Sequence, residues 1–507
     1  MAVPIVCGIE TEYGIIVRRA EESNPIAASS TLVSAYVSDL AEQGRGVGRP
    51  HRVGWDFEDE SPANDARGGA NPYSYAPEVE SHLVNAVLTN GSRYYVDHAH
   101  PELSTPECRT ALQALLYDRA GEEILLRSMR VAPRFLPEGQ EIVVYKNNSD
   151  GKGQSYGCHE NYLLSRGLPF GRLITQATSH LVTRQIFCGA GKVGTEVSGQ
   201  RRDTVSYQIS QRADFFEEEV GLETTLKRPI INTRDEPHAD ARKYRRFHVI
   251  IGDANMSEVA TLLKVGTTAL WLAVIDDDAA DKPLRFARPI PTLRAISTDL
   301  SLSEPIEMID GTTMTALEVQ WEIYRMCLAY AESHGLEAVG VDVGEMVLDR
   351  WRLILEGLES DPMSLVGQVD WIAKYRLLNG YRERHDLVGR CPAPGHGPAV
   401  PRPPPREVAG PPRRPRNDPQ RCRCPARHRQ PSARHPGVVP GHLPAAVPRR
   451  HRGRQLGLAG LRRGRVSAAP SADARAHPRH PRARWGPARQ RRHRCRTARQ
   501  ARQLRAI

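Results

Sequence analysis

Near its amino terminus the chain reads Ile5-Val6-Cys7-Gly8-Ile9-Glu10-Thr11-Glu12-Tyr13-Gly14-Ile15-Ile16-Val17. Apolar and β-branched residues dominate this segment, and that composition predicts a β-strand. Side chains two positions apart on a strand point to the same face, so Glu10 and Glu12 should present two carboxylates side by side. Such a pair needs a counter-ion or water, and either a Mg²⁺ site or a solvated strand face would satisfy it.

A second predicted strand, Arg93-Tyr94-Tyr95-Val96-Asp97, places Tyr95 and Asp97 on one face. The chain continues His98-Ala99-His100-Pro101-Glu102, so acids, a phenol and imidazoles gather within a few residues. Neither the histidine spacing of a zinc protease nor cysteine pairs occur here, which favours a carboxylate site for Mg²⁺ over a transition-metal site. Asp97 would then act on substrate as nucleophile or general base, or it merely caps the turn before Pro101.

The other elements mix helices with strands. A helix is predicted over residues 25–42 and another after the cap residue Ser257, while further strands are predicted over residues 141–146 and 247–251. There is no strict alternation of strand and helix and no internal repeat. The pattern predicts an α+β domain built on an antiparallel sheet.

A later helix has its own start signal and core face. Thr315 and Glu318 have the spacing of a capping box. The residues that follow at helical spacing form an apolar stripe that should belong to the core: Leu317, Trp321, Tyr324 and Leu328.

The most densely charged stretch runs from Lys227 to Asn255 and contains Arg234. Arginine forks bind carboxylates and phosphates in bidentate fashion, so this stretch is suited to grip both ATP and an acidic peptide, unless it is a charged surface helix. His248 differs from its neighbours because it lies in the apolar run Phe247-His248-Val249-Ile250-Ile251. It is either a ligand or a buried structural histidine.

The composition changes at residue 388. Residues 388–507 hold 30 Arg, no Lys, three acidic residues and 21 Pro, whereas residues 1–387 hold 40 basic and 56 acidic residues. With so few large apolar side chains, this tail is expected to be disordered. Arg, Pro, Ala and Gly all have GC-rich codons, so a shifted reading frame explains the mixture; the alternative is a basic arm that binds nucleic acid.

The cysteines and the hydropathy of the sequence indicate the cellular compartment of the protein. The five cysteines of residues 1–387 lack the paired spacing of metal ligands, which fits a reducing cytosol. No secretory signal is visible, because Glu10 and Glu12 follow the start so closely. No uninterrupted apolar run reaches the roughly 18 residues of a spanning helix. The sequence therefore predicts a soluble, cytoplasmic protein.

Four strings together resemble the Pup ligase and Pup deamidase family, which is related to glutamine synthetase and other carboxylate-amine ligases. They are Gly8 to Gly14, Tyr95 to Glu102, Lys146 to Tyr162 and Asn232 to Asp240. The resemblance runs from about residue 5 to residue 387. It implies a glutamine-synthetase-like fold, with a curved antiparallel sheet and helices on one face, and bound ATP and Mg²⁺.

Two features favour the deamidase branch over the ligase branch. They are Asp97 followed by His98-Ala99-His100, and a long loop around Trp55-Asp56-Phe57-Glu58, expected to be mobile over about residues 44–80. The resemblance therefore implies conversion of the carboxy-terminal Gln of the modifier Pup to Glu, and cleavage of the isopeptide bond between Pup and a substrate lysine. Pup and pupylated proteins would be the partners.

Matching positions imply roles for individual residues. Asp97 resembles the catalytic nucleophile or base, Ser104 and Arg212 resemble nucleotide contacts, and Arg234 is a candidate contact of substrate or phosphate. A metal site is implied for a larger set of acids, a tyrosine and histidines: Glu10, Glu12, Tyr95, Glu102, His159 and His248. Mg²⁺ and the arginines would polarise the scissile carbonyl while Asp97 attacks it or activates water.

The resemblance implies one catalytic domain over residues 1–387, after which the tail over residues 388–507 stands where the family has a small carboxy-terminal domain. Three rival functions remain: a Pup ligase of the same fold, a glutamate-amine ligase acting on small molecules, and a nucleic-acid-binding protein that uses the tail. No nucleic-acid or membrane partner is expected, and the oligomeric state is left open.

Overall fold

The computed structural model describes residues 2–21, 24–43, 64–67, 69–70 and 84–384. The chain divides into two units, Met1–Val408 and Ala409–Ile507, and all of the described residues belong to the first. Most of the loop predicted over residues 44–80, and the whole tail over residues 388–507, therefore lie outside the described residues.

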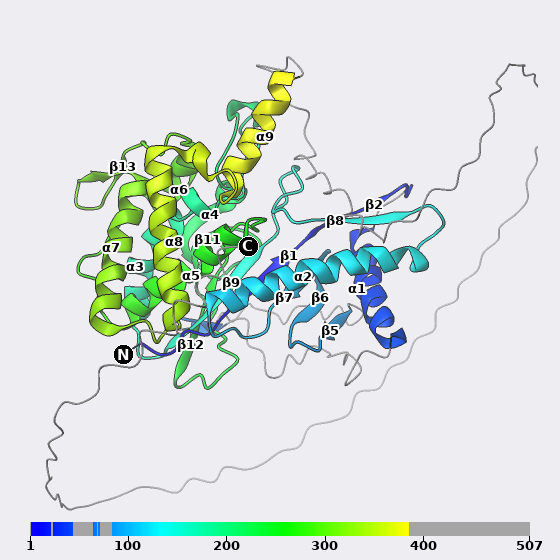
Figure 1. The fold of residues 1–507 in the computed structure, drawn as a ribbon, viewed down its shortest axis with the longest axis horizontal. Coiled ribbons are helices and arrows are strands. Elements are labelled where there is room, and N and C mark those ends of the chain that lie inside the picture. The colour runs from blue at the N-terminus through cyan, green and yellow to red at the C-terminus, as the bar shows by residue number, and fades with distance from the viewer. Residues whose placement is uncertain (1, 22–23, 44–63, 68, 71–83, 385–507) are drawn as a thin grey trace, which may run out of the picture. The chain divides into compact units, whose positions relative to one another are not determined.

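A six-stranded antiparallel sheet is the centre of the described unit, with the strand order β12-β9-β1-β7-β6-β5 (Figure 1). Its strands are β1 (Cys7–Glu12), β5 (Asn85–Val87), β6 (Arg93–Asp97), β7 (His100–Ser104), β9 (Cys158–Ser165) and β12 (Tyr244–Val249). The prediction of an α+β domain on an antiparallel sheet is confirmed.

Four two-stranded sheets complete the strands of the described part. They are β2 (Gly14–Arg18) with β8 (Glu141–Tyr145), β3 (Asn64–Asp65) with β4 (Gly69–Ala70), β10 (Phe216–Gly221) with β11 (Arg228–Asn232), and β13 (Ile306–Glu307) with β14 (Thr313–Met314). The β10–β11 pair is parallel. The single strand predicted over residues 5–17 is wrong, because β1 and β2 join different sheets on either side of the buried Tyr13.

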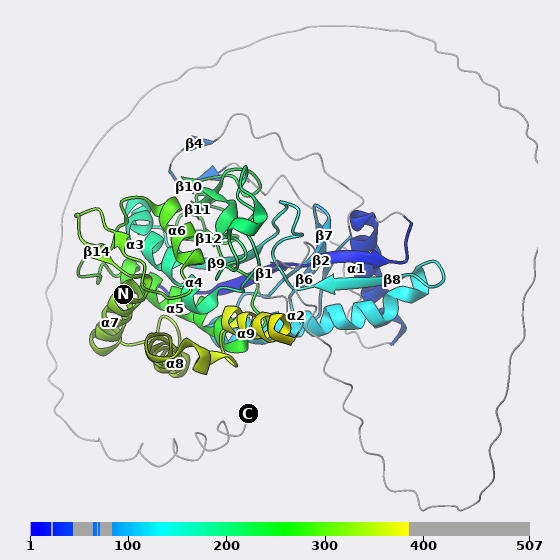
Figure 2. The same cartoon turned by 90° about the horizontal axis from the view of Figure 1, so that it is seen from above.

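The helices of the described part are α1 (Pro25–Glu42), α2 (Ala111–Val131), α3 (Phe170–Thr183), α4 (Gln185–Cys188), α5 (Glu258–Asp276), α6 (Pro289–Thr298), α7 (Ala316–His334), α8 (Val341–Ser360) and α9 (Asp370–Arg384). Helices α1, α2 and α5 pack against one face of the central sheet. Helix α2 packs against β1, and α5 packs against β9. Seen from above, α2, α8 and α9 lie on one side of the strands, and β10 and β11 lie on the other (Figure 2).

Strand alternation explains which face is covered. Cys7, Ile9 and Thr11 of β1 are buried toward the helices, and Thr11 donates a hydrogen bond to Asp118 of α2 at 3.2 Å. Residues of opposite parity on the same strand point to the other face. The polar residues Glu10 and Glu12 therefore lie on the face that the helices leave open.

Helix α5 is the central core helix. It is long and apolar enough to cross a membrane by length and composition, with a mean hydropathy of 1.5, but 89% of that window is buried inside the protein. The core helix of a globular domain passes the same test. Lys264 interrupts the apolar residues of this helix, so the prediction that no uninterrupted apolar run reaches about 18 residues is not contradicted.

Helix start signals read from the sequence are confirmed. Ser257 caps α5 by accepting a hydrogen bond from the amide of Ala260, and Thr315 and Glu318 form a reciprocal capping box at α7. The predicted core stripe of α7 is wrong at its last position, because Leu328 is 37% exposed. The charged stretch over residues 227–255 contains strands β11 and β12, so its interpretation as a surface helix is also wrong.

Candidate active site

Strand register brings polar side chains from five strands to the open face of the sheet. On one side of β1, Glu10 is paired with Ser104 of β7, and Glu12 with Glu102 of β7. Glu102 is paired in turn with Tyr95 of β6. On the other side of β1, Glu10 is paired with His159. Paired residues in adjacent strands point to the same face, so segments up to about 240 residues apart in sequence meet here.

Three carboxylates form the first group of this face, the carboxylate cluster of Glu12, Asp97 and Glu102. Each offers an oxygen, and these atoms lie within 4.8 Å of one another. Burial, and then the charges of Asp97 and Glu12, raise the pKa of Glu102 well above its ordinary value. The cluster therefore concentrates negative charge at a site that favours a proton or a cation.

Glu12 stays ionised within that cluster. Burial acts to raise its pKa, but a hydrogen bond from His100 and the positive charge of His159 outweigh it, so the pKa lies below its ordinary value. The amide of Gly157 also donates to Glu12 Oε1 at 2.7 Å. Glu12 is thus an oriented, charged oxygen donor.

The second group, the imidazole cluster, comprises Glu10, His159 and His248, again with one ligand atom each within 4.8 Å. Glu10 Oε1 accepts hydrogen bonds from Asn161 at 2.9 Å and Arg246 at 3.3 Å. Its other oxygen lies 3.6 Å from His159 Nδ1 and 3.9 Å from His248 Nε2. Burial acts to raise the pKa of Glu10, but the His159 hydrogen bond and the charge of Arg246 keep it well below its ordinary value.

His248 is neutral and offers the lone pair of a ring nitrogen to a metal ion. Burial, and then the neighbouring charge of Arg246, hold its pKa well below the ordinary value. Its Nδ1 lies 3.3 Å from Asn232 Oδ1, which assigns the proton to Nδ1 and leaves a lone pair on Nε2. Within the described residues, Nε2 is buried and has no hydrogen-bond partner. A hydrogen bond that orients the ring through one nitrogen, with the other nitrogen unpaired, is typical of a metal-binding histidine.

The residues predicted for one metal site therefore fall into two groups. Glu12 and Glu102 join Asp97 in the carboxylate cluster, and Glu10 joins the two histidines. Residues two apart on a strand are separated by about 6.6 Å, so Glu10 and Glu12 face the same way without converging on one point. Tyr95 lies beside the carboxylate cluster, with its hydroxyl 3.1 Å from Ser104 Oγ.

Both clusters fit a divalent cation. Oxygen donors that repel one another, as in the carboxylate cluster, suit a hard ion such as Mg²⁺. The imidazole cluster adds the buried, unpaired Nε2 of His248 to a carboxylate that stays ionised. A cation at either position would balance the negative charge of the carboxylates, and at the imidazole cluster it would also accept the lone pair of His248 Nε2.

The three predicted contacts of nucleotide or substrate differ in position. Ser104 ends β7 on the open face, bonded to Tyr95. Arg212 is 1% exposed and donates hydrogen bonds to main-chain carbonyls, including that of Ile250. Burial, and then the charge of Arg228, lower the pKa of Arg212 to about 10. It is therefore anchored beneath the surface, as a fixed positive charge.

Arg234 lies closer to the clusters. Burial, and then the charge of Arg246, lower its pKa, while Glu10 and Asp97 act in the opposite direction. Among the described residues its Nε is buried without a hydrogen-bond partner. Its backbone forms a bridge with Asp65, so the described part of the residue 44–80 region lies against this arginine.

Four residues that shape the site were given no role in it from the sequence, although His100 was noted in the polar cluster after β6. Asn161 and Arg246 hold Glu10, His100 lies 3.3 Å from Glu12, and Gly157 donates its amide to Glu12. Strand parity would have found two of them, because Asn161 shares the face of His159 and Arg246 that of His248.

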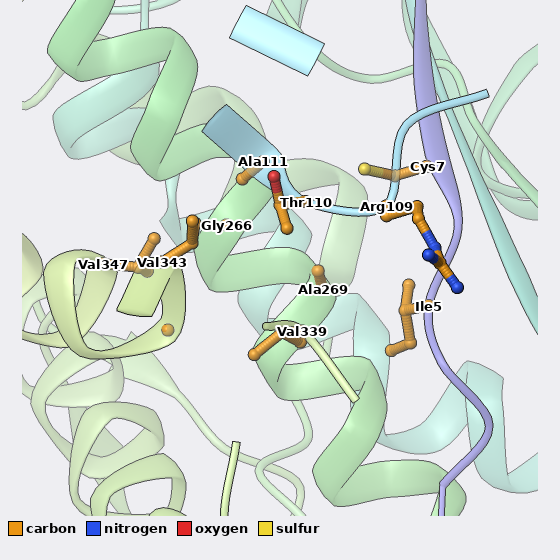
Figure 3. Close-up of a pocket in the computed structure, with 11 residues that line it drawn as sticks. Ile5, Cys7, Arg109, Thr110, Ala111, Gly266, Ala269, Val339, Val343 and Val347 are labelled. Carbon is orange, nitrogen blue, oxygen red and sulfur yellow. The ribbon is translucent and has the colours of Figure 1, made fainter. Parts of the chain in front are cut away.

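A small apolar pocket lies elsewhere in the fold. It is lined by Ile5 and Cys7 of the amino-terminal strand region, by the start of α2, and by residues of α5 and α8 (Figure 3). None of the predicted site residues lines it. The predicted site residues of the central sheet lie instead on its open face.

Fold and site together define an α+β enzyme whose polar groups gather on one face of an antiparallel sheet, with arginines beside the carboxylate and imidazole clusters. The chain belongs to the Pup-ligase protein family, whose family model matches residues 5–392. The resemblance read from the sequence, over about residues 5–387, is confirmed.

Curated relatives make the relationship more specific. The chain is 50% identical over 393 residues to a depupylase of Acidothermus cellulolyticus, covering 75% of each chain. It is 44% identical over 396 residues to a Pup deamidase/depupylase of Mycobacterium tuberculosis, covering 76% of each. A Pup–protein ligase of Kineococcus radiotolerans is 43% identical over 308 residues, covering 60% of this chain and 66% of the relative.

Solved structures share the fold. A complex between Pup and its ligase PafA superposes with a TM-score of 0.59 at 32% identity, covering 76% of this chain and 70% of that one. The ligase PafA in complex with ADP gives a TM-score of 0.55 at 38% identity, covering 60% of this chain and 67% of that one.

Proposed function

We propose that this chain is a Pup deamidase and depupylase that hydrolyses the carboxy-terminal Gln of Pup to Glu and cleaves Pup–lysine isopeptide bonds. The observation that carries the proposal is the position of Asp97, 38% exposed at the end of β6 and grouped with the buried Glu12 and Glu102. The names of the two relatives at 50% and 44% identity support the direction of the reaction.

Both reactions break the same kind of bond. In each, the side-chain amide carbon of a glutamine-type residue loses nitrogen, as ammonia or as a lysine amine, and gains the oxygen of water. Asp97 either attacks this carbon, forming an acyl intermediate that water then opens, or removes a proton from the attacking water. The arginines beside the clusters would stabilise the developing oxyanion.

ATP and Mg²⁺ are the proposed cofactors. The ADP complex of a related ligase supports nucleotide use. The carboxylate and imidazole clusters would hold Mg²⁺, which would supply positive charge next to the phosphates and the scissile carbonyl. Ser104, Arg212 and Arg234 are the proposed contacts of the nucleotide or the substrate.

The catalytic domain in this proposal is residues 1–387, acting in the cytoplasm. The family match ends at residue 392, within a few residues of that boundary. Every proposed site residue lies before that boundary.

The test is a hydrolysis assay on the purified full chain with ATP and Mg²⁺. Two substrates are used, Pup ending in Gln and a Pup–lysine conjugate, and products are measured by mass spectrometry and gel electrophoresis. Asp97→Asn should abolish both reactions without loss of fold, whereas the exposed control Asp310→Asn should behave as wild type. Absence of both reactions in the wild-type chain, and again in a chain with a frame-corrected carboxy terminus, would refute the proposal.

The second candidate is ligation, favoured by the 43% identity to a Pup–protein ligase. Ligation would consume ATP and release ADP when Pup ending in Glu meets a lysine-bearing protein. A conjugate formed under those conditions would identify the ligase, and ADP release with free amino acid and amine would identify a small-molecule ligase.

A further inference from the structure

His98 contacts Asp97 directly. Its Nδ1 lies 3.0 Å from Asp97 Oδ2, and its side chain is 71% exposed. Asp97 and His100 are paired across β6 and β7, so His98 and Ala99 form a two-residue connection. This imidazole therefore reaches the carboxylate on which the proposed chemistry depends.

The backbone of His98 adopts an unfavourable conformation. Its φ is 52°, in the left-handed region that residues other than glycine seldom occupy. Glycine would fit the first position of such a tight connection at no steric cost. Strain at a residue whose side chain bonds to a reactive group points to function.

The connection is anchored by another residue. The buried Ser29 of α1 donates a hydrogen bond to the carbonyl of Ala99 at 2.8 Å. That bond uses main-chain atoms of the turn and leaves its position independent of the side chain at residue 98. The contact between His98 and Asp97 is thus not required to hold the turn in place.

We propose that His98 is a positioning residue that donates from Nδ1 to Asp97 Oδ2 and fixes the orientation of that carboxylate on the open face. A hydrogen bond to one oxygen restricts rotation about the Cβ–Cγ bond of Asp97. The carboxylate then keeps one orientation relative to Glu12 and Glu102. This inference rests on the proposed function, because it assigns Asp97 the central role in hydrolysis.

Three substitutions separate the side chain from the backbone. His98→Gly keeps the left-handed conformation and removes the donor. His98→Asn keeps both, since asparagine tolerates this conformation and its side-chain amide can donate. Ala99→Gly is the matched control, because it loosens the same turn and keeps the carbonyl that accepts from Ser29.

The readout is depupylation by the full chain with ATP and Mg²⁺, measured as kcat and KM. His98→Gly should lower kcat about tenfold, the effect of losing one hydrogen bond to a charged group at a partly exposed site, and leave KM for the conjugate unchanged. His98→Asn should recover kcat to within about threefold of wild type, and Ala99→Gly should stay within about twofold.

Three results would overturn the inference: unchanged kcat in His98→Gly, equal losses in His98→Gly and His98→Asn, or a change confined to KM. All three require an active wild-type chain. An inactive wild type instead removes the proposed function, and the inference with it, so the two failures are told apart by the wild-type control.

Discussion

Replacing Glu102 by Gln tests whether the carboxylate cluster is strained without a cation. Glu102 is 3% exposed, and burial together with Asp97 and Glu12 raises its pKa well above the ordinary value. The substitution removes one negative charge and nearly preserves the shape of the side chain. In the absence of divalent cations, the variant should therefore be more stable than the wild type.

The sign and size follow from proton linkage. In the unfolded chain a glutamate titrates near pH 4.3, whereas folded Glu102 keeps its proton to higher pH. Between those two values the folded state binds one more proton, so wild-type stability falls by about 1.4 kcal/mol per pH unit, and the loss is complete above the folded pKa. Repulsion between charges within 4.8 Å of one another, at an effective dielectric of 20, sets a scale of about 3.5 kcal/mol or more for each neighbour.

The assay is equilibrium urea unfolding in EDTA between about pH 5 and pH 9, repeated with Mg²⁺ and ATP. The stability advantage of Glu102→Gln should be smallest at low pH and grow as pH rises. A ligand at a hundred times its Kd stabilises the folded protein by about 2.7 kcal/mol, and the variant should gain less because it has lost an oxygen ligand. Glu138→Gln, at an exposed loop position, is the matched control.

One outcome would refute the reasoning directly. If Glu102→Gln is less stable than wild type in EDTA over the whole pH range, the glutamate makes favourable contacts as an anion. The three carboxylates would then not be destabilised by the absence of a bound cation. An equal Mg²⁺–ATP increment in both proteins would contradict the assignment of Glu102 as a ligand.

Further variants test the site and its support. Gly157→Ala should weaken Mg²⁺–ATP binding at least tenfold by titration calorimetry, because the added Cβ would lie 2.7 Å from Glu12 Oε1. Arg184→Met should cost about 3–5 kcal/mol in urea unfolding, since it leaves the fully buried Glu160 carboxylate without its bidentate partner. Asp370→Ala should cost about 2–3 kcal/mol and speed amide exchange in α9, because its carboxylate accepts three hydrogen bonds from the segment that starts α5.

Local signals in the sequence predicted much of the fold. The helix over residues 25–42 has the bounds of α1, and the strand predicted over residues 93–97 is β6, because apolar periodicity and cap residues act over short distances. The break at Tyr13 escaped prediction. Continuous apolar character suits one long strand as well as two strands in different sheets, and only the tertiary pairing of β2 with β8 decides.

The candidate site was predicted in composition but not in grouping. Residue types and the family resemblance named Glu10, Glu12 and His248, yet nothing local to β1 says that its neighbours are β7 on one side and β9 on the other. Strand order assigns Glu12 to the carboxylates and Glu10 to the imidazoles. Asn161 and Arg246 were given no role for the same reason. Asn161 reaches Glu10 from β9, the neighbour of β1, and Arg246 reaches it from β12, one strand farther away.

The spacing of Glu10 and Glu12 gives this division a chemical meaning. The Cα atoms of residues two apart on a strand are about 6.6 Å apart, and here the two carboxylates turn to different neighbours, Glu12 to Asp97 and Glu102, and Glu10 to His159 and His248. Two positive centres, or one centre and a bridging phosphate, would satisfy both groups. A strand that presents Glu10 and Glu12 on its open face is therefore suited, together with cations, to a substrate or cofactor rich in negative oxygen, which is the chemistry that ATP would bring to the proposed amide-hydrolysing site.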